Sequence, residues 1–185
     1  ESLPPEHPAS TIFNIARIAP EKTRGSFFTS ALTTLRLFTS KSIYGMTCKS
    51  DFSLKQSGER KTVTYIILPD EKTTYYPLAS LFVYQNYVSL VESADERGGE
   101  LKIRVNYILD EFGNFTTIPA FGNMLTVAGG RRIRFNLFLQ SFSQLDNKYG
   151  REIAENIRDN CQTWIYLKTA SNETASIISK KLGTY

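Results

Sequence analysis

Hydrophobic and polar positions along the chain change their period near residue 60. Before that point, apolar residues such as Phe28, Leu32 and Leu35 recur at steps of three and four, which places them on one face of a helix. The helical elements predicted here are residues 9–18, residues 21–38, and a short turn capped by Asp51 and ended by Gly58. We therefore predict that residues 1–58 form a mainly helical segment.

After residue 60, runs rich in β-branched and aromatic residues alternate with helical patterns. The predicted strands are residues 62–68, 101–109, 133–139 and 163–167. The predicted helices are residues 75–94, 118–128, 142–149, 152–160 and 172–182, the last with Asn172 as its cap. Because strands and helices alternate, we predict an α/β fold for residues 59–185, with a parallel sheet, right-handed crossovers and flanking helices.

Composition excludes several classes of site and leaves others open. The chain has 185 residues, of which 41% are hydrophobic and 22% charged, and this is ordinary for a globular domain with a sizeable core. The net charge of +4 is compatible with nucleic acid but does not indicate it. Cys48 and Cys161 lack the spacing of a disulfide framework or a zinc site, and the sole histidine is His7. We therefore expect neither histidine-based catalysis nor a histidine-based metal site.

Polar side chains follow two neighbouring strands of the predicted sheet. Asp110 and Glu111 end the second strand, and Gln140 ends the third. In a parallel sheet these ends share one edge, where ligands bind. One carboxylate can hold the water shell of Mg²⁺, the next can polarise an attacking water, and a glutamine can donate to that water or to a phosphate oxygen. The alternatives are a solvated turn for the acids and, for Gln140, a helix-capping turn through Ser141 or Ser143.

The run GGRRIR at residues 129–134 carries a cluster of arginines between these two strand ends. A charge run is usually an exposed basic face. An arginine here also has the chemistry of an arginine finger, which reaches the phosphate of a nucleotide held by a neighbouring subunit. The spacing leaves both interpretations open.

Three motifs together resemble those of the type IV coupling protein family, the TraG/TraD-type ATPases of conjugation and type IV secretion. They are NYILDEFGNF at residues 106–115, GRRIRF at residues 130–135, and LQSFSQL at residues 139–145 with Tyr149-Gly150 behind it. An acid pair alone is common among P-loop ATPases, whereas its combination with LQSFSQL and the following Tyr-Gly is specific. The resemblance extends over most of the chain from about residue 20 onward.

The resemblance implies a role for each candidate residue. Asp110 would coordinate Mg²⁺, Glu111 would activate water, and Gln140 would take the phosphate-sensing position. Arg131 is the candidate for the arginine that acts in trans, and Arg132 competes with it. The implied cofactors are ATP and Mg²⁺.

The resemblance also implies a fold and a cellular role. Residues 1–58 would be the end of the family's all-α insertion, and residues 59–185 the C-terminal part of a RecA-like nucleotide-binding domain. The parent protein would be a homo-hexameric motor anchored on the cytoplasmic side of the bacterial membrane. It would deliver a relaxase–DNA complex to the type IV secretion channel, with the relaxase, accessory relaxosome proteins and channel proteins as partners. We expect only weak, salt-dependent binding of DNA, because basic residues are scattered along the chain.

One departure from the family pattern changes these expectations. The phosphate-cradling motif G-x-x-x-x-G-K-[ST] is absent from these 185 residues, and in the family it lies well upstream. We therefore expect the chain by itself to be inactive and unable to bind ATP tightly. Without the strand that carries this motif, a sheet edge stays uncovered, so we also expect oligomerisation or a disordered portion in isolation.

Two other functions remain open. In the first, the chain is a recognition module for DNA, relaxase or accessory proteins that acts through its N-terminal helices and has no catalytic role. Alternatively, the parent protein would be another RecA/FtsK-type DNA translocase, such as a chromosome-segregation or packaging motor.

Overall fold

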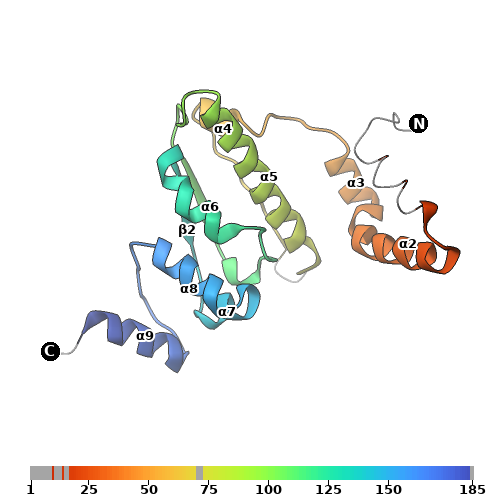
Figure 1. The fold of residues 1–185 in the computed structure, drawn as a ribbon. Coiled ribbons are helices and arrows are strands. Elements are labelled where there is room, and N and C mark those ends of the chain that lie inside the picture. Colours follow the sequence, from red (N-terminus) through yellow and green to blue (C-terminus); the bar gives the residue numbers. More distant parts are fainter. Residues whose placement is uncertain (1–9, 11–13, 15–16, 70–72, 184–185) are drawn as a thin grey trace. The chain divides into compact units, whose positions relative to one another are not determined.

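The chain folds into two compact units, Glu1–Asp51 and Phe52–Tyr185. The computed structural model describes residues 10, 14, 17–69 and 73–183 (Figure 1). Most of the helix predicted over residues 9–18 lies outside the described residues. No helix in the described part of the chain is both long and apolar enough to cross a membrane.

The first unit is helical in its described part. Its described elements are α2 (Glu21–Leu35), η1 (Arg36–Thr39) and α3 (Lys41–Thr47). The helix predicted over residues 21–38 is therefore an α-helix that tightens into a 3-10 turn at Arg36. Leu32 and Leu35, on the predicted apolar face, are 66% and 53% exposed. The assignment of residues 1–58 to an all-α insertion stays a prediction.

The second unit contains a two-stranded parallel sheet flanked by helices, so the predicted α/β class is confirmed. β1 (Val105–Leu109) pairs with β2 (Ile133–Leu137), and Tyr107 lies opposite Phe135 in the register (Figure 1). Both strands are shorter than the predicted runs over residues 101–109 and 133–139. In such a pair the carboxyl ends of both strands lie at the same edge.

One face of this sheet is buried against α5 (Tyr76–Asp95) and α6 (Phe121–Ala128). Tyr107 stacks on Phe135 with ring centroids 4.7 Å apart, and its hydroxyl donates to Oδ1 of Asn86 on α5. Burial raises the pKa of the Tyr107 phenol. The other face is exposed at Ile108, where a parallel sheet would ordinarily be covered.

Seven further helical elements complete the described part of the second unit. They are α4 (Gln56–Glu59), η2 (Thr73–Tyr75), η3 (Phe112–Asn114), η4 (Gly129–Arg131), α7 (Ser143–Tyr149), α8 (Arg151–Asn160) and α9 (Asn172–Leu182). The predicted helices 118–128, 142–149 and 152–160 correspond to α6, α7 and α8, with shifted starts. The glycine pair 129–130 directly follows α6 and begins the 3-10 turn η4.

Two predicted end signals were wrong in detail. Gly58 does not end a helix but lies inside α4, where its carbonyl accepts the Ile103 N–H at 3.0 Å. A Cβ at Gly58 would lie 2.7 Å from Cδ2 of Leu101, so glycine permits the close approach. At α9 the cap is Ser171, whose Oγ accepts the Thr174 N–H at 3.2 Å, and not Asn172.

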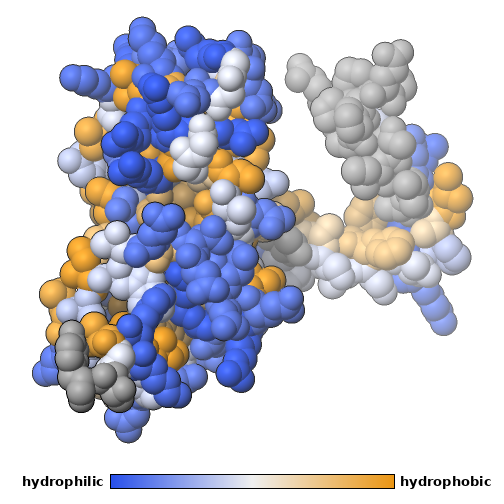
Figure 2. All heavy atoms as spheres, turned by 60° about the vertical axis from the view of Figure 1, so that its left-hand side comes forward, coloured by the Kyte–Doolittle hydropathy of each residue, from blue (hydrophilic) through white to orange (hydrophobic). Residues whose placement is uncertain are grey.

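The strands predicted over residues 62–68 and 163–167 were also wrong. Neither segment forms a strand or joins a ladder, and Val63, Ile67 and Leu167 are 73%, 90% and 89% exposed. Residues 62–68 and β1 line a cleft of about 960 Å³, and residues 163–167 and β2 line one of about 940 Å³. Hydrophobic residues lie at the surface among hydrophilic ones, as Figure 2 shows. A high β-propensity indicates side chains that fit a half-buried pleated sheet. These two segments have such side chains but are not part of a sheet.

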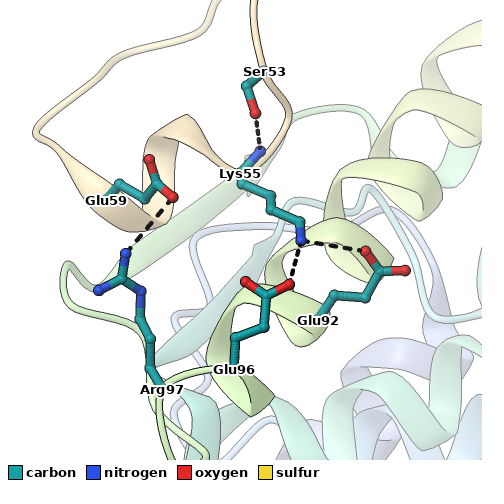
Figure 3. Close-up of polar contacts among 6 residues, drawn as sticks. All are labelled: Ser53, Lys55, Glu59, Glu92, Glu96 and Arg97. Atoms are coloured by element: carbon teal, nitrogen blue, oxygen red, sulfur yellow. Dashed lines mark hydrogen bonds and ion pairs between the residues drawn. The ribbon is translucent and has the colours of Figure 1, made fainter.

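Ion pairs attach the start of the second unit to the C-terminal end of α5 (Figure 3). The Lys55 Nζ lies 2.8 Å from Oε1 of Glu96 and 3.6 Å from Oε2 of Glu92, and Arg97 pairs with Glu59. The hydrogen bond to Glu96 is the main reason that the pKa of Lys55 is raised, and the same contact lowers the pKa of Glu96. These exposed contacts orient α4 beside α5.

Candidate functional site

The acid pair occupies a tight turn that begins where β1 ends. The Phe138 N–H donates to the Leu109 carbonyl at 3.1 Å, and the Phe112 N–H donates to the Phe138 carbonyl at 3.0 Å. The backbone between these bonds reverses at Glu111, which adopts the left-handed conformation with φ 49° and ψ 38°. For a residue with a Cβ this conformation costs about 1–2 kcal/mol.

The aromatic ring of Phe112 holds that turn in place. Only 1% of Phe112 is exposed, and its ring centroid lies 4.9 Å from that of Phe121 and 5.7 Å from that of Phe115. The Tyr149 ring stacks on it from α7 at 6.2 Å. Because the ring is buried immediately after Glu111, the Glu111 side chain is directed away from the core. Strain of this kind persists only where the surrounding structure determines the backbone, and such positions cluster at functional sites.

The structure places Glu111 and Gln140 against each other. Nε2 of Gln140 donates to both carboxylate oxygens of Glu111, at 3.3 and 3.2 Å, and Nδ2 of Asn114 donates to Oε2 at 3.3 Å. The neighbouring Asp110 is exposed, and its Oδ1 accepts the Glu111 N–H at 3.0 Å. An acid pair and an amide therefore share the carboxyl edge of the sheet. The alternative for Gln140 is not observed, since α7 has no side-chain cap.

Arg131 and Arg132 do not lie with these residues. Both precede β2, whereas Gln140 follows it. Arg131 is 29% exposed and its Nη2 lies 3.3 Å from Oδ1 of Asp95, while Nε of Arg132 lies 2.8 Å from Oε2 of Glu100. Within the described part of the chain, Nε of Arg131 is buried without a hydrogen-bond partner. Neither arginine forms an ion pair with Asp110 or Glu111 of its own chain, and the role in trans stays a prediction.

Two further residues of this edge were not singled out from the sequence. Asn114 binds Glu111, and Gln144 contacts the loop that carries Gln140. Both lie within the quoted motifs, NYILDEFGNF and LQSFSQL, so motif membership was the available signal. Their contacts depend on turns whose geometry the residue pattern does not specify.

The donor set at this edge fits Mg²⁺ held together with phosphates. Magnesium is bound by one or two carboxylates plus substrate phosphates and waters, and Asp110 and Glu111 supply hard oxygen ligands. Among the described residues, no three histidine, cysteine, aspartate or glutamate side chains are grouped as a metal site.

Comparison with known proteins gives the family. Residues 4–185 match the family model described as type IV secretory system conjugative DNA transfer. The chain belongs to this family. The resemblance predicted from the three sequence motifs is thereby confirmed.

Curated members of this coupling protein family are similar along most of the chain. VirD4 of Rhizobium rhizogenes is 28% identical over 152 residues, which are 82% of this chain and 22% of that protein. VirD4 of Rhizobium radiobacter is 30% identical over 152 residues, with the same two shares. TraG of Escherichia coli is 27% identical over 175 residues, which are 89% of this chain and 27% of that protein. The chain thus spans about a quarter or less of the length of these relatives.

Proposed function

We propose that this chain carries the catalytic acids of an ATP-driven coupling protein of conjugation. The full-length protein would be a homo-hexamer on the cytoplasmic side of the bacterial membrane that delivers a relaxase–DNA complex to the type IV secretion channel. Family membership supports the coupling role. The observation that carries the proposed chemistry is the contact of Gln140 with Glu111, beside Asp110, at one edge of the sheet.

In this proposal Asp110, Glu111 and Gln140 each have a separate role in ATP hydrolysis. Asp110 would hold Mg²⁺, and the bound ion would supply positive charge against the phosphate oxygens. Glu111 accepts a proton from the water that attacks the γ-phosphorus, as ADP leaves. Gln140 donates its amide N–H to that water or to a phosphate oxygen, and its contact with Glu111 supports a role beside the water-activating carboxylate.

The remaining parts of the proposed site come from another segment of the full-length protein and from a neighbouring subunit. A phosphate-cradling loop is supplied by another segment of the full-length protein, and Arg131 or Arg132 acts on the nucleotide of a neighbouring subunit. The two clefts beside β1 and β2 support this division, because much of their lining is apolar and such surfaces are ordinarily covered by another element.

The decisive experiment changes the acids in the full-length protein. Asp110→Ala and Glu111→Gln are expected to abolish both ATP turnover and DNA transfer between cells. Glu155→Gln, an exposed acid on α8, is the matched control and is expected to leave both unchanged. Normal transfer by either acid variant would refute the proposal.

The isolated chain gives a second test. Calorimetric titration of the 185 residues with Mg·ATP is expected to show no binding, because the phosphate-cradling loop supplies most of the grip on the phosphates. Micromolar binding would mean that another phosphate site lies within the chain, and the roles of Asp110, Glu111 and Gln140 would have to be reassigned.

Exposed apolar residues on the first unit favour a recognition role for it. Phe27, Leu32 and Leu35 of α2 are about half or more exposed, and a patch of this kind is suited to a protein partner. Residues 1–58 are therefore the second candidate for function, as a surface that binds relaxase or accessory proteins. Capture of purified relaxase by this segment supports it, and loss of capture in Leu32→Ser is the check.

A further inference from the structure

The loop that carries Gln140 has its backbone bound by side chains from elsewhere in the chain. The Gln140 N–H donates to Oε1 of Gln144 at 3.0 Å, and the same oxygen lies 3.5 Å from the Ser141 nitrogen. Oγ1 of Thr169 donates to the Gln140 carbonyl at 3.1 Å, and Oγ1 of Thr174 accepts the Phe142 N–H at 3.0 Å. The conformation of this loop is thus determined by tertiary hydrogen bonds, since it has no ladder or helix of its own.

The Gln144 side chain also touches the turn that follows the acid pair. A Cβ built on Gly113 would lie 2.3 Å from Cδ, 2.4 Å from Oε1 and 2.6 Å from Nε2 of Gln144. The carboxamide therefore fills the space that any larger residue at position 113 would need. Gly113 lies two residues after Glu111, so one side chain contacts both loops that meet at the carboxyl edge.

We infer that Gln144, seated on Gly113, is a positioning residue that sets the Gln140 side chain against Glu111. This inference rests on the proposed function, because it assigns Gln144 a part in the same hydrolytic site. The Gln140 amide nitrogen is bonded to the Cα that carries the side chain, so fixing that amide restricts the direction in which the side chain leaves the backbone. Catalytic groups must be held within about 0.5 Å of their working positions by supporting hydrogen bonds of this kind.

Two variants separate the hydrogen bond from simple packing. Gln144→Met keeps the length of the side chain and removes the acceptor oxygen. Gly113→Ala leaves Gln144 intact but pushes its carboxamide away from the loop. Because the clash is with the end of a flexible side chain and Gly113 does not require a positive φ, the fold is expected to survive. Asn147→Ala is the control, an exposed amide on the same helix.

The expected result concerns turnover in the full-length protein. Gln144→Met and Gly113→Ala are each expected to lower kcat for ATP about ten-fold with KM unchanged, since small displacements of a catalytic group are costly. Gln144→Glu, which keeps an acceptor oxygen, is expected to recover most of that loss. If Gln144 acts through Gln140, the double variant Gln140→Ala/Gln144→Met is no slower than Gln140→Ala alone.

The outcomes distinguish this inference from the proposed function. If Gln140→Ala lowers turnover while Gln144→Met and Gly113→Ala do not, the positioning role is overturned and the proposed function stands. Additive losses in the double variant would also overturn it, because Gln144 would then act independently of Gln140. If Asp110→Ala and Gln140→Ala leave turnover unchanged, the proposed function itself fails. Thermal melting of each variant identifies unfolding, and should Gln144→Met unfold, Gly113→Ala provides the test.

Discussion

Replacing Phe112 by alanine tests whether the core builds the turn of the acid pair. The ring is 1% exposed and packs on Phe115, Phe121 and Tyr149. Removing a buried phenyl ring in such a setting costs about 3–5 kcal/mol. Since domains are stable by only about 5–15 kcal/mol, this change takes a large part of the total. It also removes the group that holds the strained backbone of Glu111 in place.

Urea unfolding of the purified chain, followed by circular dichroism at 222 nm, measures the effect. With a slope of about 2 kcal/mol per molar urea, the midpoint is expected to fall by roughly 2 M. Phe112→Leu fills part of the space and is expected to fall between the alanine variant and the wild type. Val127→Ala, on the exposed side of α6, is the control and is expected to change stability by less than about 0.5 kcal/mol.

The result that refutes the reasoning is a Phe112→Ala variant as stable as Val127→Ala. The ring would then contribute nothing to the core, and the left-handed conformation of Glu111 would need another cause. A second outcome is a variant that is destabilised as expected but keeps full ATP turnover in the full-length protein. It would refute the idea that Phe112 positions the acid pair for catalysis. It would show that the turn of the acid pair does not depend on Phe112.

Other consequences of the structure are directly measurable. Ser171→Ala removes the cap of α9 and is expected to destabilise by about 1 kcal/mol in urea unfolding, whereas Ser171→Asp keeps it. Gly25→Ala adds a methyl group to α2 where nothing lies within 4 Å, so helicity is expected to rise with a gain of about 0.5–1 kcal/mol. The lowered pKa of Glu96 means that its pairing with Lys55 stabilises the fold above the ordinary carboxyl value of 4.5 and is lost as pH falls through the lowered pKa. The raised pKa of Lys55 means that its stabilisation is complete below 10.5 and is lost as pH rises through the raised pKa. In an NMR titration, Lys55→Gln is expected to return the Glu96 midpoint toward 4.5, and an unchanged midpoint would show that the pair is not formed in solution.

The residue pattern by itself determined the parts that depend on local chemistry. Apolar residues at helical spacing over residues 75–94 predicted α5, and runs of β-branched residues predicted β1 and β2. The acid pair and Gln140 were found because polar residues directly follow those buried strands, and parallel strands bring such residues to one edge. The three motifs also sufficed for the family, because they combine a common acid pair with a specific glutamine-containing run.

Only the tertiary structure decided which apolar segments are covered and which side chains meet. Residues 62–68 and 163–167 have the pattern of strands but pair with nothing in the described part of the chain, because a ladder needs a neighbour and the pattern does not provide one. The left-handed backbone of Glu111 follows from burial of the next residue, Phe112. The place of Gln144 against Gly113 depends on two turns meeting, and no local preference of either residue contains that information. Propensity and period act over a few positions, whereas strain and contact between loops arise only when the whole unit is packed.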